Sequence, residues 1–420
     1  MAHSSRPVTA VVVGAGGRGI TYSLFALQHP DRLRIVGVAE PREWNRNHMV
    51  ELHHIAPENV FTDWRDLAAR PRMADAVIIA TQDRMHADPA EAFAALGYAI
   101  LLEKPMAPSE AECVRIVDAV KRAGVLFAVC HVLRYTGYTR ALKKLLDDSA
   151  VGEVISIQHL EPVGYWHQAH SFVRGNWRNS QESSPMLLSK SCHDLDWMRY
   201  IMGTSCRSVS SFGELTHFKK DQKPPQAGNA TRCLECLYEP QCPYSAKKIY
   251  LGRLARGETG WPVDVVVPEP TVESLTEALR TGPYGRCVYE CDNDVVDHQV
   301  VNLLFEGGKT GVFTMTAFNQ SAHRKTRIFG TRGEIFGDGE RIELFDFLTD
   351  QTRIIETDSP DGSILGGHGG GDYGLMDAFV SAVAAGDQSL ILSGAEESLE
   401  THRMVFAAER ARLEHRVVDL

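Results

Sequence analysis

The sequence predicts two domains of the α/β class: a doubly wound parallel sheet at the amino terminus, then an α+β domain with a large, mainly antiparallel open sheet. Short apolar runs alternate with helical segments over residues 1–135, which is typical of helical crossovers between parallel strands. From residue 298 onward, strand-like segments follow one another with glycine-rich turns between them, which favours antiparallel pairing. The 420 residues also exceed what one hydrophobic core usually serves, so residues 136–420 are expected to form the second domain.

The composition is typical of a soluble globular protein, with 44% hydrophobic and 23% charged residues. The formal net charge of −10 argues against a general binder of nucleic acid or of anionic membranes. No apolar run approaches the roughly 18 residues that span a bilayer, and residues 1–7 lack the apolar stretch of a signal peptide. We therefore expect a cytoplasmic protein without nucleic-acid or membrane partners, whose nine cysteines are thiols or metal ligands rather than disulfides.

The first strand leads into a glycine-rich loop. Residues 8–13 are apolar and mostly β-branched, and the GxGxxG formed by Gly14, Gly16 and Gly19 follows, before a helix expected over residues 20–27. The first glycine permits a tight turn, the second lets backbone amides approach a pyrophosphate, and the third lets helix and strand pack closely. Such a loop is a weak signal alone, because glycine-rich turns between strand and helix are common.

The second strand adds context to this loop. It covers residues 33–39 and ends in Glu40, twenty-one residues after Gly19, where dinucleotide-binding folds place an acid on the adenosine ribose. A carboxylate there favours NAD, since it would repel the 2′-phosphate of NADP. Arg42 follows two residues later and could reverse this preference.

The alternation of strand and helix continues. Further strands are expected at residues 75–80, 98–102 and 125–130, and Ser109 with Glu112 forms a capping box that begins another helix. The triplet Glu103-Lys104-Pro105 directly follows a buried apolar strand. Such residues belong at the carboxyl edge of a parallel sheet, where α/β folds bind their ligands.

These motifs resemble those of the Gfo/Idh/MocA oxidoreductases, a family with an amino-terminal Rossmann domain. The resemblance implies that the Lys104 side chain reaches the reacting hydroxyl of a carbohydrate or polyol substrate, and that a cis peptide precedes Pro105. It further implies a homodimer or homotetramer formed through the open sheet. The residues expected to bind the cofactor are Gly14, Gly16, Gly17, Arg18, Gly19, Glu40, Thr81, His86 and Glu103.

The chain then crosses to the second domain. Arg134 follows the last strand of the first domain, and it could pair with an acid at the domain junction or touch the substrate. After a strand at residues 154–160, aromatic and basic residues crowd into residues 166–178, among them Trp166 and Arg174. Such a segment could contact a polyol through indole faces and charged donors, or could instead be pinned to its own domain.

Residues 187–202 predict a helix ending at Gly203. Its polar face carries His193, the natural candidate for the base that accepts a hydroxyl proton. In the family this helix carries Asp-x-x-x-His, and His193 matches the histidine, whereas Ser189 stands where the aspartate is expected. Ser189 could still bind a hydroxyl, or Lys190 could bind the substrate in its place, for example through an anionic group.

Residues 216–297 form an insert that contains a cluster of cysteines. Cys233, Cys236 and Cys242 could form a structural zinc site with a more distant cysteine. Free thiols or a disulfide are the alternatives.

The remainder predicts a sheet and two helices. Strands are expected at 154–160, 207–215, 300–305, 311–317, 325–329, 333–337, 341–347 and 353–356. A glycine-dense loop, residues 366–373, precedes a helix at 375–385; in it His368 could contact the substrate, unless the loop is a linker. Ser393 is expected to cap a final helix at about 394–414.

The leading hypothesis is an NAD-dependent oxidoreductase that transfers hydride between the carbinol of a sugar, sugar derivative or cyclitol and nicotinamide, with Lys104 and His193 as the catalytic residues. Binding of NADP is the less favoured alternative. Two other functions are considered. One is an oxidoreductive glycoside hydrolase, which oxidises the ring transiently and reduces it again. The other is a non-catalytic sensor of dinucleotides, for which retention of both Lys104 and His193 would be unnecessary.

Overall fold

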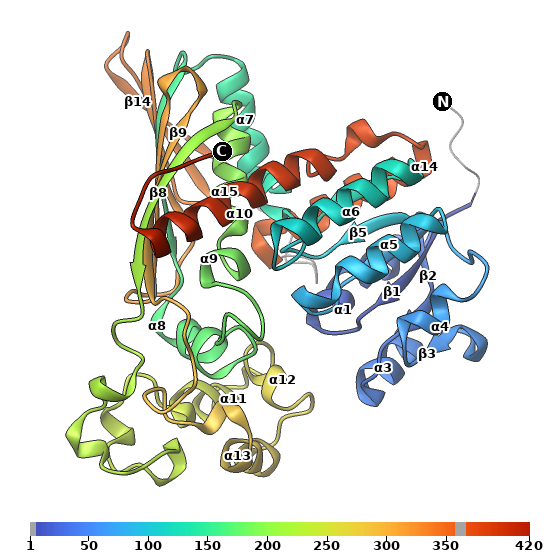
Figure 1. Cartoon of the computed structure of the whole chain (residues 1–420), viewed down its shortest axis with the longest axis vertical. Helices are drawn as coiled ribbons and strands as arrows, with labels where there is room; N and C mark the ends of the chain where they lie inside the picture. Colours follow the sequence, from blue (N-terminus) through green and yellow to red (C-terminus); the bar gives the residue numbers. More distant parts are fainter. Residues whose placement is uncertain (1–5, 358–366) are drawn as a thin grey trace.

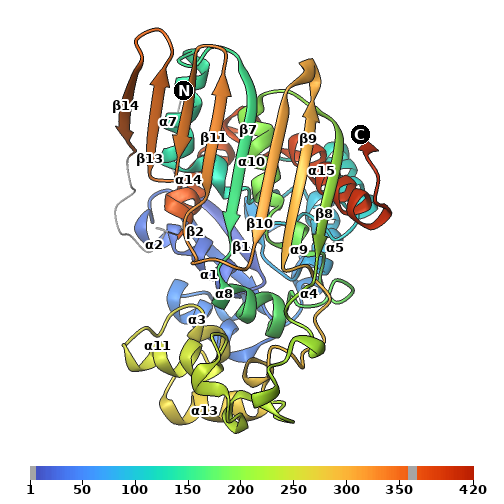
Figure 2. The same cartoon turned by 90° about the vertical axis from the view of Figure 1, so that its left-hand side faces the viewer.

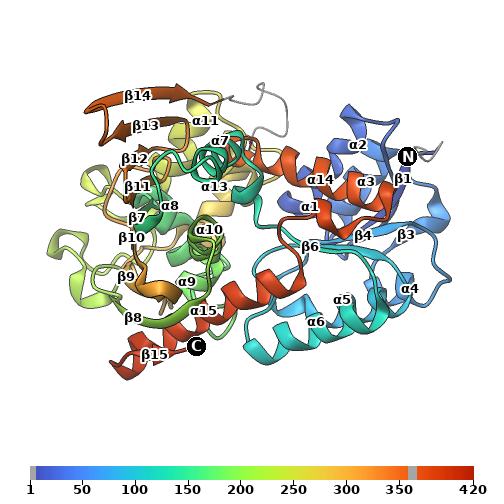
Figure 3. The ribbon, with the colours of Figure 1, turned by 90° about the horizontal axis from the view of Figure 1, so that it is seen from above.

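The computed structural model describes residues 6–357 and 367–420. Residues 1–5 and 358–366 lie outside the described residues. Two expectations fall in part on them: the amino-terminal segment at residues 1–7 and the glycine-dense loop at residues 366–373. The chain forms two sheets with helices between them (Figure 1, Figure 3). This arrangement confirms the predicted fold class, a parallel α/β sheet followed by an α+β domain with a mostly antiparallel sheet. The domain boundary at residue 135 stays a prediction.

Six parallel strands form the first sheet, in the order β3-β2-β1-β4-β5-β6. They are β1 (Val8–Val13), β2 (Leu33–Ala39), β3 (Val60–Phe61), β4 (Ala76–Ile79), β5 (Ala99–Leu102) and β6 (Phe127–Val129). The strand order reverses between β1 and β4, which pair in parallel through Val13 and Ile79. In open α/β sheets, ligands bind beyond the carboxyl ends of the strands at this switch point.

Helices cover both faces of this sheet. The helices within its own chain segment are α1 (Gly17–Ser23), α2 (Phe25–Gln28), α3 (Glu43–His53), α4 (Trp64–Ala68), α5 (Ala87–Ala95) and α6 (Glu110–Ala123). A helix from far along the chain, α14 (Gly371–Ala385), also packs on it. Its Leu375 and Phe379 share one core with Val12 of β1 and Ile35 of β2.

The second sheet has nine strands in the order β14-β13-β12-β11-β7-β10-β9-β8-β15. They are β7 (Val154–Pro162), β8 (Cys206–Glu214), β9 (His298–Phe305), β10 (Thr310–Thr316), β11 (Lys325–Gly330), β12 (Gly333–Gly337), β13 (Arg341–Asp346), β14 (Gln351–Glu356) and β15 (Val418–Asp419). All neighbours are antiparallel except β7 and β10.

Among the residues that the structure describes, helices cover one face of the second sheet and leave the other uncovered. The helices that lie between the two sheets are α7 (Gly137–Asp147), α9 (Met186–Ser189), α10 (Cys192–Met202) and α15 (Ala395–Glu414). In Figure 2, α7 and α10 lie behind the strands, and the other face of the sheet is turned to the viewer. No helix of the described ranges 6–357 and 367–420 is long and apolar enough to cross a membrane.

The insert between β8 and β9 lies at the lower end of the molecule in Figure 1. Its helices are short: α11 (Gly252–Ala255), α12 (Val263–Val266) and α13 (Val272–Thr281). It packs against α8 (Tyr165–His167) and the π-helical turn η4 (Gln168–Arg174), because Ala169 and Val173 of η4 share a core with Tyr250 and Leu275.

Two local expectations were wrong. The helix expected over residues 187–202 is broken: α9 ends at Ser189 and α10 begins at Cys192, since Lys190 and Ser191 leave regular helical geometry. Ser393 does not cap the last helix, whose N-cap is Gly394. The Ser393 hydroxyl lies instead 2.6 Å from the Val129 carbonyl and 2.8 Å from the Tyr135 hydroxyl, so a buried partner replaces the cap.

Candidate active site

The glycine-rich loop turns at the carboxyl end of β1. Gly14 has a φ of +90°, and a Cβ at this position would lie 2.6 Å from the Ala80 carbonyl oxygen. A Cβ at Gly19 would lie 2.1 Å from the Gly14 carbonyl oxygen, so the first turn of α1 could not pack so closely on the strand. A Cβ at Gly17 would meet no atom within 4 Å. The amides in the first turn of α1 are therefore approachable, and they fit the pyrophosphate of a dinucleotide.

Glu40 lies beside this loop at the end of β2. Its carboxylate accepts hydrogen bonds from the Ala15 amide (2.8 Å) and from Arg42 Nε (2.7 Å). Burial raises the pKa of the Glu40 carboxyl, but the hydrogen bonds and charge of Arg42 outweigh this effect, and the pKa is lowered. A charged Glu40 next to the loop fits a ribose with free hydroxyls.

His86 and Thr81 hold the neighbouring turns together. His86 is fully buried, with Nδ1 2.8 Å from the Pro105 carbonyl and Nε2 3.1 Å from the Thr81 carbonyl. It therefore joins the turns that follow β4 and β5. This position gives His86 a structural role and does not support direct contact with a cofactor, which was expected of it.

Glu103 anchors the triplet at the end of β5. Its carboxylate accepts hydrogen bonds from Arg18 Nε (2.7 Å) and the Tyr22 hydroxyl (2.8 Å), both on α1, and from the Lys104 amide. Arg18 also bonds to Asp372 in the first turn of α14. The glycine-rich loop, the triplet and α14 are thus tied into one ionic network.

Lys104 lies next to Ser189 of the second domain. It is half-buried and precedes a cis peptide to Pro105. Its Nζ donates a hydrogen bond of 2.7 Å to the Ser189 carbonyl, which is freed from helical pairing where α9 ends. The Ser189 hydroxyl instead lies within hydrogen-bond distance of the Pro185 and Met186 carbonyls, so it is turned back into its own helix.

His193 lies in the first turn of α10, close to Lys104. It is buried, and its Nδ1 has no hydrogen-bond partner in the described chain. Burial lowers the pKa of His193 well below its ordinary value, and the positive charge of Lys104 lowers it further. His193 is therefore neutral at physiological pH and able to accept a proton.

A network of alternating charges lies beside Lys190. Lys190 Nζ is 3.1 Å from Glu161 Oε1, and Arg324 Nη2 is 3.0 Å from Glu161 Oε2. Arg324 also pairs with Asp194, whose other neighbour is His159 Nε2 at 3.1 Å. Since Glu161 balances Lys190, these groups suit a neutral molecule rich in hydroxyls rather than an anion.

An aromatic surface covers this region from the side of the insert. His167 ends α8, and burial followed by the charge of Lys190 lowers its pKa well below its ordinary value. The ring of Trp261 packs edge-on against His167 at 4.9 Å between centroids and lies 5.2 Å from the Trp166 ring. Trp166 in turn stacks with the Arg253 guanidinium at 4.1 Å.

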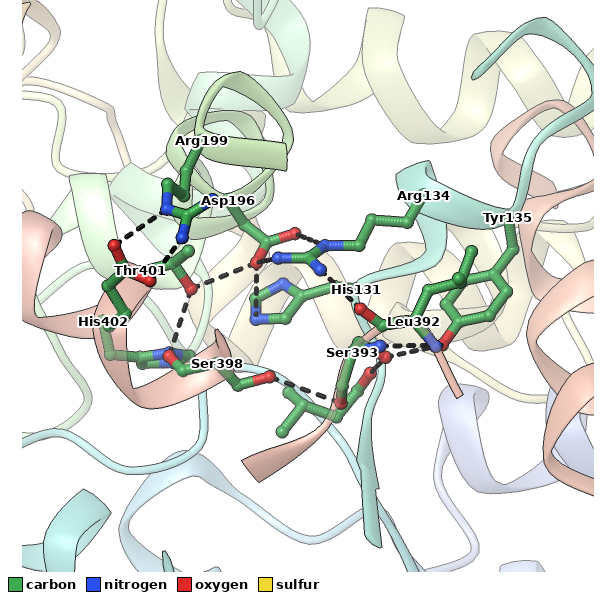
Figure 4. A network of polar contacts seen from close by, with 12 residues as sticks. His131, Arg134, Tyr135, Asp196, Arg199, Leu392, Ser393, Ser398, Thr401 and His402 are labelled. Carbon is green, nitrogen blue, oxygen red and sulfur yellow. Dashed lines mark hydrogen bonds and ion pairs between the residues drawn. The ribbon is translucent and has the colours of Figure 1, made fainter. Parts of the chain in front are cut away.

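Arg134 lies at the domain junction. Its guanidinium makes two hydrogen bonds of 2.7 Å to Asp196 of α10, and it also donates to the Leu392 carbonyl (Figure 4). Each of its three guanidinium nitrogens therefore donates to a residue at the domain junction. Contact with a substrate, the other role considered for Arg134, is not supported.

Arg174 also lies apart from Lys104 and His193. It is 1% exposed and donates to the Arg286 and Tyr244 carbonyls within the insert. Of the two roles considered for its segment, the structure assigns Arg174 to attachment to the domain, and substrate contact is not supported.

His368 lies near His193. Its ring lies 6.0 Å from that of His193, and its Nδ1 lies 3.2 Å from Asp372 Oδ2. Burial raises the pKa of the Asp372 carboxyl, but Arg18 and His368 lower it to about 2. Asp372 is thus a charged anchor, and His368 approaches the site from the amino end of α14.

The expected zinc site is not supported. Cys233, Cys236 and Cys242 do lie around one small cavity together with Cys287. Within the described residues, however, no group of three His, Cys, Asp or Glu side chains could hold a metal ion. The guanidinium of Arg174 lies 3.4 Å from Cys233 Sγ, where a fixed positive charge opposes a second cation.

Sequence reasoning missed several residues at this site. His131 is buried, and within the described residues neither ring nitrogen has a hydrogen bond, although Nε2 lies 3.7 Å from Asp196 Oδ1 (Figure 4). Its ring lies 5.9 Å from that of His193. Burial lowers the pKa of His131 to about 3, against the pull of Asp196. Arg324 and Trp261 were missed because they come from segments far from the recognised motifs. His167, by contrast, belongs to the crowded segment 166–178 that the sequence analysis considered for contact with a polyol.

Known proteins share this architecture. Two family models match the chain: an oxidoreductase family with an NAD-binding Rossmann fold over residues 8–131, and its C-terminal alpha/beta domain over residues 143–420. A crystal structure of an oxidoreductase from Agrobacterium radiobacter in complex with NAD+, L-tartaric acid and magnesium has the same fold. It superposes with a TM-score of 0.70 at 15% identity, over 98% of each chain.

Two characterised relatives are similar in sequence over part of their length. The 2,7-anhydro-N-acetylneuraminate hydratase of Escherichia coli is 28% identical over 269 residues, 63% of this chain and 66% of the hydratase. The inositol 2-dehydrogenase of Klebsiella pneumoniae is 28% identical over 199 residues, 47% of this chain and 55% of the dehydrogenase. The chain thus spans less than two thirds of either relative. The two family models, which together cover nearly all of the described residues, show that the chain belongs to the Gfo/Idh/MocA family of oxidoreductases with an NAD-binding Rossmann fold.

Proposed function

We propose that the protein is an NAD-dependent oxidoreductase acting on the CH–OH group of a sugar, sugar derivative or cyclitol. The observation that carries this proposal is the approach of Lys104, at the end of β5, to the break between α9 and α10 next to His193. One residue comes from the edge of the cofactor domain and the other from the second domain, so the two halves of a catalytic site converge. When bound, NAD supplies the hydride acceptor.

Lys104 and His193 have different roles at the substrate hydroxyl group. The Lys104 ammonium donates a hydrogen bond to the substrate oxygen, orients it and stabilises negative charge on it. His193, neutral because its pKa is lowered by burial and by Lys104, accepts the hydroxyl proton at a ring nitrogen. Glu103 holds the Lys104 backbone in place through its bond to the Lys104 amide.

Hydroxyl-rich substrates suit the remaining surface. Lys190 and Arg324 are balanced by Glu161 and Asp194, so these groups offer both donors and acceptors without a net charge to attract an anion. The aromatic rings of His167 and Trp261 offer faces on which C–H groups of a ring can stack. The inositol 2-dehydrogenase relative agrees with a polyol substrate.

A redox-neutral reaction is the second candidate. Ser189 replaces the expected aspartate, and its hydroxyl is turned into its own helix. One relative carries the name of a hydratase, and hydration leaves the overall oxidation state unchanged. In this variant the substrate is oxidised only transiently and a bond to a leaving group is broken before the ring is reduced again.

The assay is a panel of polyols, aldoses, anhydrosugars and aryl glycosides incubated with the purified protein and NAD+. Net NADH formation from a free polyol or sugar supports the dehydrogenase. Product release from a glycoside or an anhydrosugar without net NADH supports the redox-neutral variant. Tight NAD binding with no turnover on any member of the panel would contradict both and favour a sensor.

We also propose NAD as the cofactor in preference to NADP, because Glu40 engages Arg42 and repels a 2′-phosphate. Replacing Glu40 by Ser is expected to raise the ratio of kcat/KM for NADP+ to that for NAD+ by about tenfold or more, since Arg42 is released to pair with the phosphate. Glu43→Ser, in the exposed first turn of α3, is the matched control and should leave the ratio unchanged. An unchanged ratio in Glu40→Ser would contradict this role for Glu40.

The oligomer is proposed to be a homodimer or homotetramer formed through the open sheet face. That face exposes large apolar side chains, among them Phe212 of β8 (58% exposed) and Ile354 of β14 (55% exposed). Light scattering by the purified protein at the mass of a single chain would contradict this assembly. A cytoplasmic location is also proposed, in keeping with nine free thiols.

A further inference from the structure

Trp261 is a large apolar side chain that the insert holds in a half-exposed position. It is 47% exposed, whereas Val263, two residues later, is fully buried in the core of the insert. The indole packs nearly perpendicular to the rings of His167 and His170, at 4.9 and 5.4 Å between centroids, and lies 5.2 Å from the ring of Trp166. These four side chains form one aromatic cluster, in which the indole is fixed by three other rings and still presents an open surface.

The inner rings of the aromatic cluster are held firmly. His170 is buried, its Nδ1 lies 2.8 Å from the Tyr250 hydroxyl, and its ring stacks on Tyr284 at 4.9 Å between centroids. Burial, followed by the charges of Arg174 and Arg253, lowers the pKa of His170 to about 3, so this ring is neutral. A ligand that stacks on the cluster therefore meets a surface that loses little conformational freedom on binding.

The aromatic cluster continues the surface that begins at Lys104. The pKa of His167 is lowered by burial, then by the charge of Lys190 and, to a lesser degree, by that of Lys104, so His167 lies within electrostatic reach of both lysines. In Figure 1, α8, which carries His167, lies between α9 and the helices of the insert. A sugar ring whose hydroxyl meets Lys104 can reach His167, but Trp261 lies one ring farther out. Contact with both Lys104 and Trp261 therefore requires a substrate with a second ring.

The outer part of the aromatic cluster has a polar edge. The Arg253 guanidinium lies over the Trp166 ring, 4.1 Å from its centroid, and Arg253 Nη1 donates to Glu258 Oε2 at 2.9 Å. This pair offers donors and acceptors beside an aromatic face, and its two charges balance each other. A pyranose ring fits both features, because it has an apolar C–H face and hydroxyls around its rim, whereas an aryl group would use the indole alone.

We propose that the aromatic cluster is a subsite for a second pyranose ring, so that the substrate is a disaccharide or longer glycoside rather than a free sugar or cyclitol. This inference rests on the proposed function, because the first ring is the one whose carbinol meets Lys104 and His193. The second ring stacks its C–H face on Trp261 and directs hydroxyls toward Arg253 and Glu258. The subsite decides which substrate binds and not its net oxidation, so it serves both candidate reactions.

The experiment is titration calorimetry of the NAD+-loaded protein with matched ligands. The pairs are glucose and cellobiose, galactose and lactose, and mannose and mannobiose, each with the corresponding 4-nitrophenyl glycoside as a third ligand. At least one disaccharide is expected to bind about tenfold more tightly than its monosaccharide, the usual effect of stacking one further ring on an aromatic side chain. The same disaccharide should change the tryptophan fluorescence of the protein.

Variants at Trp261 test the stacking surface. Trp261→Ala should bring the ratio of disaccharide to monosaccharide affinity close to one, and Trp261→Phe, which keeps an aromatic face, should retain part of the advantage. Leu237→Ala is the matched control, because it removes another exposed apolar side chain of the insert (93% exposed) from outside the cluster, and it should leave the ratio unchanged. If Trp261→Ala does not fold, the ratio in the unchanged protein and in Trp261→Phe still decides.

Several results would overturn the proposal. They are equal affinity for every disaccharide and its monosaccharide, no detectable binding of any disaccharide, or a ratio that the Trp261 variants leave unchanged. Tighter binding of the 4-nitrophenyl glycosides alone would assign the cluster to an aryl group and overturn the pyranose. Calorimetry needs no turnover, so disaccharide binding through Trp261 without any oxidation would contradict the proposed function alone. Oxidation of a free polyol with no effect of Trp261 would contradict the subsite alone.

Discussion

Replacing Lys104 by methionine is expected to lower kcat by about 10²- to 10³-fold, the usual effect of removing one preorganised donor to a reacting oxygen. The Lys104 ammonium is held at 2.7 Å from the Ser189 carbonyl, so little reorganisation is needed when a substrate hydroxyl takes its place. Methionine keeps the length and apolar stem of the side chain and removes the charge. The measurement is steady-state turnover with the best substrate of the panel, together with NAD affinity and thermal unfolding.

Two variants give this experiment its controls. Lys104→Arg keeps the charge but not the shape, and should recover only part of the rate. Lys144→Met removes an exposed lysine of α7 that pairs with Asp148, and should leave turnover unchanged. If Lys104→Met kept kcat within about threefold while binding NAD normally, its assignment as a catalytic residue would be wrong.

Replacing Asp196 by alanine is expected to lower the free energy of unfolding by about 3–5 kcal/mol. Asp196 is fully buried, and both carboxylate oxygens accept from Arg134 at 2.7 Å; Oδ1 also accepts from the Thr401 hydroxyl at 3.1 Å (Figure 4). The variant leaves the Arg134 guanidinium buried and unpaired. Urea-induced unfolding, followed by fluorescence and circular dichroism, measures the change.

A double variant separates the contribution of the ion pair from the cost of leaving one charge unpaired. Arg134→Met combined with Asp196→Leu removes both charges, and it should be more stable than Asp196→Ala alone. Asp148→Ala, which breaks the exposed pair with Lys144, should cost less than about 1 kcal/mol. A loss below about 1 kcal/mol in Asp196→Ala would mean that this junction contributes little to stability.

Most of the first sheet could be predicted from the sequence, because its signals are local; only the two-residue edge strand β3 was missed. Val8–Val13 is an apolar run closed by glycine, and the structure begins and ends β1 at these residues. Glu40 and the triplet Glu103-Lys104-Pro105 were found for the same reason: each directly follows a strand, and the carboxyl ends of parallel strands share one edge. The family resemblance was confirmed as well.

The partners of these residues could not be predicted, because they depend on packing between distant segments. Asp372 reaches Arg18 across 354 positions of the chain, and no local pattern records this. The break after Ser189 was missed since the apolar periodicity continues through it, and only the tertiary contact with Lys104 shows its use. For Arg174 the sequence left substrate contact and attachment to its own domain open, and only its hydrogen bonds to carbonyls of the insert favour attachment.

The position of α14 has a consequence for the order in which the chain is made. The first sheet ends with β6 at Val129, but the helix that completes its core begins at Gly371. At about 5–20 residues per second, the ribosome needs roughly 10–50 s to pass from one to the other. During that interval the nascent sheet presents Val12 and Ile35 without the apolar cover of Leu375 and Phe379. The first sheet is therefore synthesised well before the helix that completes its core.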